Sequence, residues 1–248
     1  MKLSLIGCGT GNPEHITIQA IQTLRQADLI LLPDKGSSKS ALADYRYHIL
    51  SAYLVERPAI TPISFPTRRT DIPYKEAVQQ WHDEISVLWQ QALHQTPPPQ
   101  HVALLVWGDP SLYDSTLRIA DRLEPKPELN IIPGISSLHV HTAAHQIPLN
   151  SLAGDVQIMT GRNLVAKGFP EQADTIFVML DGQTAFSSIE NADAYQIYWG
   201  AYLGMKEQIL IAGRLDEVRE EICQTRAAAR QQQGWIMDSY LIRRRGCS

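Results

Sequence analysis

The chain has 248 residues, of which 44% are hydrophobic and 19% are charged, and its formal net charge is −4. This length suits one large domain or two modest ones, and the composition is typical of ordinary soluble globular proteins. No apolar run approaches the roughly 20 residues that a membrane span needs, and the first residues lack the apolar run of a secretory signal. The acidic balance argues weakly against nucleic-acid binding. Cys8, Cys223 and Cys247 form neither a disulfide framework nor a paired metal motif, which favours a reducing cytoplasm.

The first half of the chain alternates apolar runs with helical patterns. Residues 3–7 and 28–33 are short and continuously apolar, as buried parallel strands require. Between them apolar residues recur at helical spacing, with Asn12 suited to the N-cap and Pro13 to the first helical position. The chain is therefore expected to open as strand, turn, helix and strand. The further elements expected in this half are helices at 41–55, 74–94 and 115–123, a proline-broken edge strand at 59–64 and a buried strand at 101–107.

The second half is richer in strands. The stretch EPKPE at 124–128 changes the composition and is the expected linker between domains 1–125 and 128–248. A strand, a turn and a helix at 129–149 follow. Because so few helices separate the later strands, we expect a mixed, partly antiparallel sheet. The later elements expected are strands at 155–161, 175–180, 194–202, 207–213 and 235–242, with helical stretches at 184–190 and 214–232.

Two arginine-containing stretches are expected to be solvated. RAAARQQQ at 226–233 has the composition of a helix end that runs into solvent, and the run RRR at 243–245 is expected to be a solvated tail without a role.

The first candidate ligand loop is glycine-rich and follows the first strand. Its glycines are Gly7, Gly9 and Gly11, and Asn12-Pro13 stands where a dinucleotide fingerprint would have its third glycine. Alternate glycines let the backbone approach a ligand closely, and helix N-terminal amides suit an anion. The loop therefore fits a nucleotide, a phosphate or a tight turn that holds no ligand.

Two further loops follow buried strands, where ligands gather in open α/β sheets. Gly108-Asp109-Pro110 forces a turn after the strand at 101–107, and Asp109 could accept hydrogen bonds from a ligand or cap the turn. After Pro133-Gly134, Ser136 or Ser137 could cap the next helix or bind a ligand.

Histidines at 139, 141 and 145 lie in the helix that follows these serines. His141 and His145 are four residues apart and so share a helix face, but the glutamate of an HExxH zinc motif is missing. Hydrogen-bonded, partly buried histidines are therefore the preferred interpretation, and no metal site is expected.

Together, the three loops identify a protein family far more specifically than any one of them does alone. The order GxGxGNPE, then GDPxxY, then PGxSS followed by a proline-leucine pair resembles the tetrapyrrole methylases, which are S-adenosylmethionine-dependent enzymes of corrin and sirohaem synthesis. The resemblance covers nearly the whole chain. It implies a homodimer of two α/β domains, an N-terminal parallel sheet and a C-terminal mixed sheet, with S-adenosylmethionine in the cleft between them. The stretches at 198–215 and 234–244 narrow the resemblance to the deacetylating methylases that act on precorrin-5 in aerobic cobalamin synthesis.

The resemblance also implies roles for individual residues, carried over by position. Trp107 departs from the small or aliphatic residue that the family usually has before its Gly-Asp pair. The implied cofactor contacts are Pro13, Trp107, Gly108, Asp109, Leu112, Ser136, Ser137, Met179 and Leu203.

The implied reaction is methylation of ring carbon C-1 with hydrolytic loss of the acetyl group there. Acetyl loss needs a water positioned by a base, for which Asp34 is the main candidate and Tyr113 a second. Gly9 and Gly11 would line the trough for the tetrapyrrole, and Arg68 and Arg69 would bind its carboxylates unless they form only a solvated loop.

Two other functions stay open at this point. One is a methylase of the same fold that acts on another ring carbon, on rRNA or on diphthamide, which the late stretches argue against. The other is a corrinoid carrier without catalysis, which would not need intact cofactor loops.

Overall fold

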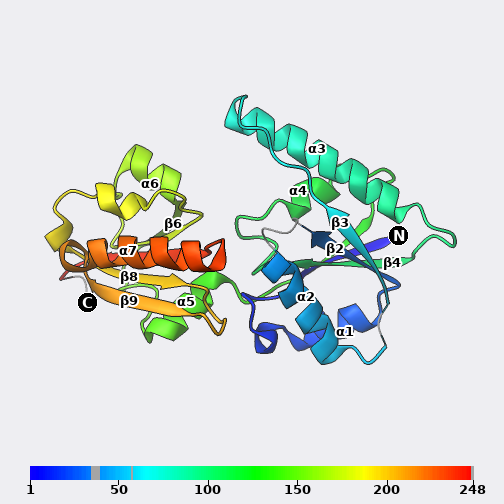
Figure 1. Cartoon of the computed structure of the whole chain (residues 1–248), viewed down its shortest axis with the longest axis horizontal. Coiled ribbons are helices and arrows are strands. Elements are labelled where there is room, and N and C mark those ends of the chain that lie inside the picture. Colours follow the sequence, from blue (N-terminus) through cyan, green and yellow to red (C-terminus); the bar gives the residue numbers. More distant parts are fainter. Residues whose placement is uncertain (35–39, 57, 247–248) are drawn as a thin grey trace. The chain divides into compact units, whose positions relative to one another are not determined.

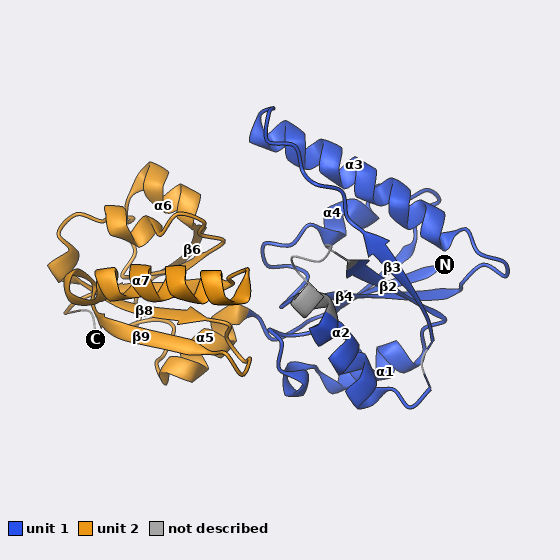
Figure 2. Cartoon of the chain, viewed as in Figure 1, with its two compact units in different colours: residues 1–136 blue, residues 137–248 orange. Residues whose placement is uncertain are grey.

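The computed structural model describes residues 1–34, 40–56 and 58–246, without the side chains of Asp34 and residues 40–43. The chain divides into two compact units, residues 1–136 and residues 137–248 (Figure 2).

Unit 1 is built on a parallel sheet with the strand order β3-β2-β4-β1-β5 (Figure 1). Because the strands are parallel, their carboxyl ends lie along one edge of the sheet, and the loops after them can meet there. The strands are β1 (Lys2–Gly7), β2 (Leu29–Asp34), β3 (Ala59–Ser64), β4 (His101–Val106) and β5 (Glu128–Ile132). The helices are η1 (Pro13–His15), α1 (Ile18–Arg25), α2 (Ser40–Tyr53), α3 (Tyr74–Leu93) and α4 (Thr116–Ala120).

The apolar runs of this sheet are buried on both faces. Leu3 and Leu5 of β1 pack in one cluster with Trp89 of α3, whereas Ile6 packs in a second cluster with Leu24 of α1. Figure 1 shows α3 on one side of the sheet and α1 and α2 on the other. This two-sided burial explains why the strands are apolar throughout instead of alternating with polar residues.

Unit 2 is built on a mixed sheet with the strand order β6-β7-β10-β8-β9, in which β6 and β7 are parallel and the other pairs are antiparallel. Helix α7 contacts β8 and β9, and α5 contacts β9 and β10. Figure 1 shows these two helices on opposite faces of the sheet. The strands are β6 (Val156–Thr160), β7 (Thr175–Met179), β8 (Tyr195–Ala201), β9 (Ile209–Arg214) and β10 (Asp238–Arg244). The helices are α5 (Ser137–His145), α6 (Gly161–Lys167), η3 (Ala185–Ser188), η4 (Ala192–Ala194) and α7 (Leu215–Gln233).

The predicted class, two α/β domains with a parallel N-terminal and a mixed C-terminal sheet, is confirmed. The expected linker at 124–128 does not coincide with the division at residue 136, because β5 pairs with β1 along Lys2–Ile6 and so belongs to unit 1. Within the described ranges, no helix has the length and apolarity needed to cross a membrane.

Two local predictions for unit 2 need correction, and one helix was not predicted. The stretch 184–190 forms the 3-10 turn η3 instead of an α-helix. Helix α6 was not predicted, since it is short and starts directly at the end of β6, where the Thr160 side chain accepts a hydrogen bond from Asn163 N. The arginine run at 243–245 is not a solvated tail, because Arg243 and Arg244 lie in β10 and donate to main-chain oxygens of Pro148 and Ala173.

Candidate functional site

The loops after β1 and β4 are joined through their backbones. Gly108 N donates a 2.8 Å hydrogen bond to Gly9 O, and Cys8 N donates to Val106 O at 2.9 Å. Gly9 and Gly108 form an isolated antiparallel bridge. Both have positive φ, +77° for Gly9 and +68° for Gly108, which an L side chain would strain. Gly9 and Gly108 therefore allow the two loops to come into backbone contact.

The loop after β5 approaches the same point. A Cβ added to Gly134 would lie 2.2 Å from Gly108 O and 2.7 Å from Gly7 Cα, and these backbone atoms cannot turn aside as a side chain can. Gly7, Gly108 and Gly134 thus let three loops, widely separated in the sequence, touch at the carboxyl edge of the sheet. We call this contact the glycine junction.

Asp109 holds the glycine junction together. Its Oδ2 accepts a 2.9 Å hydrogen bond from Gly134 N, and its Oδ1 accepts from Ser111 N at 2.8 Å and from Ser111 Oγ. Both carboxylate oxygens are therefore engaged by the protein itself. This arrangement favours Asp109 as the residue that positions two loops, in addition to any contact with a ligand.

Two buried donors near these loops have no hydrogen-bond partner among the described residues. They are Trp107 Nε1, at the end of β4, and Ser137 Oγ, at the start of α5. The Trp107 ring stands edge-on to Tyr45 of α2, with 6.2 Å between centroids. Because an unpaired buried donor costs about 1–3 kcal/mol, such groups call for an explanation such as a ligand with acceptor atoms. Both residues are among the cofactor contacts that the sequence resemblance implies.

The remaining implied cofactor contacts divide between the two units. Asn12 caps η1 through Glu14 N, as predicted, and Pro13 O accepts a 3.1 Å hydrogen bond from Tyr53 Oη. Leu112 and the buried Ser136 lie in unit 1. Met179, at the end of β7, and Leu203, in the turn after β8, lie in unit 2.

The candidate bases differ in how they are placed. The backbone of Asp34 ends β2, which neighbours β4 in the sheet, but its side chain lies outside the described part. Tyr113 is 43% exposed and has φ of +51°. Partial burial raises the pKa of its phenol, so at neutral pH Tyr113 is a hydrogen-bond donor and a poor base.

The two arginines proposed for substrate binding make local contacts. Arg69 pairs with Asp71 at 2.6 Å, and both side chains are mainly exposed. The Arg68 guanidinium lies over the Tyr74 ring, 4.8 Å from its centroid. Arg69 is thus already neutralised in part, whereas the stacked Arg68 keeps its charge available to an anion.

Two histidines of α5 lie against each other, the buried His141 and the partly buried His145, with 4.7 Å between their ring centroids. His145 Nε2 lies 3.1 Å from Trp199 O, and His141 Nδ1 lies 3.3 Å from Ser239 Oγ. Burial, with a smaller effect of His145, lowers the pKa of His141 to about 3. In the described residues, no three His, Cys, Asp or Glu side chains gather as a metal site would require.

Sequence reasoning missed two buried arginines. Arg46 of α2 donates from Nε to Leu105 O at 3.2 Å. Arg226 of α7 is only 8% exposed and pairs with Asp238 at 2.9 Å, so RAAARQQQ does not simply run into solvent. The missed signal was spacing: Arg46 precedes the buried Ile49 by three residues, and Arg226 follows the buried Ile222 by four. Each arginine therefore lies on the apolar face of its helix.

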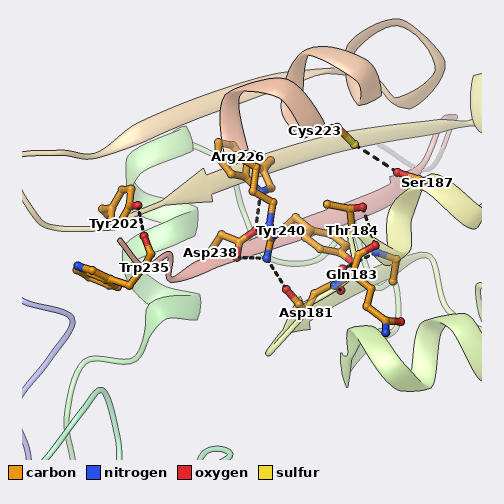
Figure 3. A network of polar contacts seen from close by, with 12 residues as sticks. Asp181, Gln183, Thr184, Ser187, Tyr202, Cys223, Arg226, Trp235, Asp238 and Tyr240 are labelled. Carbon is orange, nitrogen blue, oxygen red and sulfur yellow. Dashed lines mark hydrogen bonds and ion pairs between the residues drawn. The ribbon is translucent and has the colours of Figure 1, made fainter. Parts of the chain in front are cut away.

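Arg226 belongs to a polar network inside unit 2 (Figure 3). Its Nη2 donates to Asp181 O at 2.8 Å, and Tyr240 Oη donates to the Asp181 carboxylate at 2.7 Å. Asp238 also accepts from Trp199 Nε1 at 3.0 Å. Burial raises the pKa of Asp238, although its partners Arg226 and Trp199 act in the opposite direction. The network ties α7 and β10 to the segment that follows β7.

Comparisons with known proteins agree with this architecture. The precorrin-6A synthase [deacetylating] of Sinorhizobium sp is 45% identical over 250 residues, which cover 98% of this chain and 95% of that protein. The precorrin-2 C(20)-methyltransferase of Sinorhizobium sp is 25% identical over 70% of each chain.

Among solved structures, a cobalamin synthesis related protein from Corynebacterium diphtheriae superposes with a TM-score of 0.84 at 36% identity, over 98% of this chain and 99% of that one. A uroporphyrin-III C-methyltransferase from Thermus thermophilus, complexed with S-adenosyl homocysteine, has a TM-score of 0.58 at 16% identity over 98% of this chain and 92% of that one, which shows a shared fold.

The family match covers most of the chain. Residues 2–219 match the Tetrapyrrole (Corrin/Porphyrin) Methylases, and this range contains the glycine junction and both unpaired donors. The chain therefore belongs to the tetrapyrrole methylases.

Proposed function

We propose that the chain is a precorrin-6A synthase that methylates ring carbon C-1 of precorrin-5 and releases the acetyl group there as acetate. The observation that carries this proposal is the 45% identity to the precorrin-6A synthase of Sinorhizobium sp, which extends over 98% of the chain. Identity at that level covers the late stretches as well as the cofactor loops, whereas the precorrin-2 methyltransferase matches only 70% of the chain.

The methyl donor of this family is S-adenosylmethionine, whose sulfonium supplies an already activated methyl group. The residues present fit such a ligand, because Trp107 Nε1 and Ser137 Oγ are buried donors that lack a partner among the described residues. The glycine junction keeps side chains away from the backbone at Gly108, which leaves that backbone open to close approach. Of the other proposed contacts, Pro13 and Leu112 belong to unit 1, and Met179 and Leu203 belong to unit 2.

The chain must also position a water for acetyl loss, and Asp34 is the proposed base. Support comes from its backbone: it ends β2, the strand beside β4, at the sheet edge where the glycine junction lies. Hydrolysis removes the acetyl group as acetate and leaves an electron-rich ring carbon, which can then attack the methyl group. Methyl transfer itself needs mainly proximity and orientation. Tyr113 would donate a hydrogen bond, in keeping with its raised pKa.

The substrate carries many carboxylates, so its trough should contain cations. We propose that Gly9 and Gly11 line the trough and that Arg68 binds a carboxylate, with Arg69 doing so only if it exchanges Asp71 for the substrate.

The chain would work as a homodimer in the cytoplasm. The family resemblance supports the dimer, and the unpaired thiols of Cys8 and Cys223 suit a reducing compartment. Light scattering during gel filtration tests the dimer.

Substrate choice tests the proposed function against its alternatives. The purified chain would be offered S-adenosylmethionine with precorrin-5 or with precorrin-2. We expect methylation of precorrin-5 alone. Methylation of precorrin-2 alone would identify a methylase for another ring carbon, and tight corrinoid binding without any methyl transfer would identify a carrier.

Asp34→Asn tests the proposed base, with Asp44→Asn as the matched control at an exposed position of α2. Asn keeps the size of Asp34 but removes its basicity, so acetate release should fall by roughly 10²–10⁴, the usual contribution of a positioned base. Methylation should fall in parallel, and the affinity for S-adenosylhomocysteine should stay near the parent value. Acetate release at the parent rate would exclude Asp34 as the base.

A further inference from the structure

Unit 2 contains a hollow of about 590 Å³, whose lining includes none of the residues proposed to contact the cofactor or the reacting carbon. It lies where the C-terminal half of α7 faces the segment after β7. Its lining includes Thr184, Cys223, Arg226, Arg230, Gln231 and Gly234. We call it the α7 pocket.

The polar groups of the α7 pocket are suited to an anion. Two guanidiniums, an amide and a hydroxyl line it, and no Asp or Glu is among the described residues that do so. Guanidinium groups offer a planar set of N–H donors and no acceptor, which matches the geometry of a carboxylate.

Arg226 is fixed at the inner wall of the α7 pocket. Its Nε donates to Asp238 at 2.9 Å and its Nη2 donates to Asp181 O at 2.8 Å (Figure 3). No hydrogen bond of Nη1 to any described residue is seen. The ion pair therefore holds the guanidinium in one orientation while leaving N–H groups for a ligand, and a donor held in advance loses little entropy on binding.

Arg230 supplies the uncompensated charge. It is exposed, lies one turn beyond Arg226 on α7, and forms no ion pair within the described ranges. A cation in the last turn also stabilises a helix. If Arg230 only stabilised the helix end, its substitution would change stability and not substrate binding. An experiment can therefore separate helix stabilisation from anion binding.

We propose that the α7 pocket binds a peripheral carboxylate of the tetrapyrrole substrate, through Arg230 and the free edge of the Arg226 guanidinium. This inference rests on the proposed function for the identity of the substrate. The pocket would hold an acetate or propionate side chain of the ring. Its two arginines would contribute to substrate binding and not to the chemical step.

Kinetics with precorrin-5 test the proposal directly. Arg230→Gln removes the charge but keeps a long polar side chain, and Arg219→Gln makes the same change at another exposed position of α7 that does not line the pocket. Loss of one charge-assisted contact should raise KM by about 10-fold or more. We expect kcat to stay within about twofold of the parent value for both variants. In Arg230→Gln the lost contact would bind substrate and transition state equally, so its loss should raise KM alone. A parent-like KM for Arg230→Gln would overturn the proposal.

Cys223 provides a second measurement that does not depend on turnover. Its thiol lines the α7 pocket, is partly exposed and lies 3.5 Å from Ser187 Oγ (Figure 3), whereas Cys8 is buried. Uroporphyrin, a stable tetrapyrrole with eight carboxylates, would be the probe. It should slow alkylation of Cys223 by iodoacetamide severalfold, as measured by peptide mass spectrometry, and should do so much less in Arg230→Gln.

The outcomes separate this inference from the proposed function. Protection of Cys223 by uroporphyrin in a chain that does not convert precorrin-5 would support the pocket and contradict the proposed function. Conversion of precorrin-5 with no protection, or equal protection by acetate at the same carboxylate concentration, would overturn the pocket as a tetrapyrrole site.

Discussion

The glycine junction predicts a measurable role for the Asp109 carboxylate. In Asp109→Asn the side chain keeps its size, but one acceptor oxygen becomes an amide donor. The parent carboxylate accepts from Gly134 N on one oxygen and from Ser111 N and Oγ on the other. Whichever way the amide turns, its NH₂ group must face an N–H donor.

The stability cost of Asp109→Asn is set by the amide orientation that loses the weaker hydrogen bonding. If the amide oxygen stays on Ser111, the Gly134 N–H loses its acceptor, and an unsatisfied donor at such a site costs about 1–3 kcal/mol. Because the Gly134 contact is only part-buried, we expect about 1–2 kcal/mol. The loops would also be held less firmly, so S-adenosylhomocysteine should bind about 5- to 30-fold more weakly if the same energy is lost from the site.

Urea unfolding and calorimetry with S-adenosylhomocysteine measure the two effects. The control is Asp121→Asn, which removes an ion pair between Asp121 and Lys126 whose side chains are more than half exposed and should change stability by less than about 1 kcal/mol. If Asp109→Asn matches the control in both stability and affinity, Asp109 is a simple turn former and the junction does not depend on it.

Three other substitutions or conditions give expected outcomes. Gly134→Ala would place a Cβ 2.2 Å from a backbone oxygen; urea unfolding should show a loss of about 1–3 kcal/mol, against little change for Gly182→Ala, where the Cβ meets open space. Burial lowers the pKa of His141 from 6.5 to about 3. The contribution of the neutral His141 to the free energy of unfolding is therefore fully present above pH 6.5 and is lost towards pH 3, by at most about 1.4 kcal/mol per pH unit. His141→Gln should make the unfolding free energy depend less on pH in this range. Asp238→Asn leaves Arg226 buried without its counter-charge and should cost about 3–5 kcal/mol in the same unfolding assay; a parent-like value would mean that the pair is solvated.

The strands and the loops after them could be predicted because both depend on local sequence patterns. Buried parallel strands read as continuous apolar runs, and glycine or proline turns after them mark the ligand edge, so β1, β4 and their loops were assigned from the sequence. Which loops touch was not predictable. The approach of Gly134 to Gly108 depends on strand order, and the sequence does not state that β1 lies between β4 and β5.

The buried arginines escaped prediction for another physical reason. Arginine is usually exposed, so the sequence predicts a solvated helix end at 226–233 and does not single out Arg46. The spacing of Arg46 and Arg226 to apolar neighbours nevertheless places both on buried helix faces. Arg226 is stable there because Asp238 arrives from β10, twelve residues later in the chain. A partner supplied by tertiary structure cannot be inferred from the helix alone.

The stoichiometry of one reaction tests the central claim most directly. The chain would be incubated with methyl-labelled S-adenosylmethionine and precorrin-5, and acetate and labelled product would be measured in the same samples over time. We predict equimolar acetate and transferred methyl at every time point, because the ring carbon becomes nucleophilic only when its acetyl group leaves. Methyl transfer without acetate would contradict the proposed reaction.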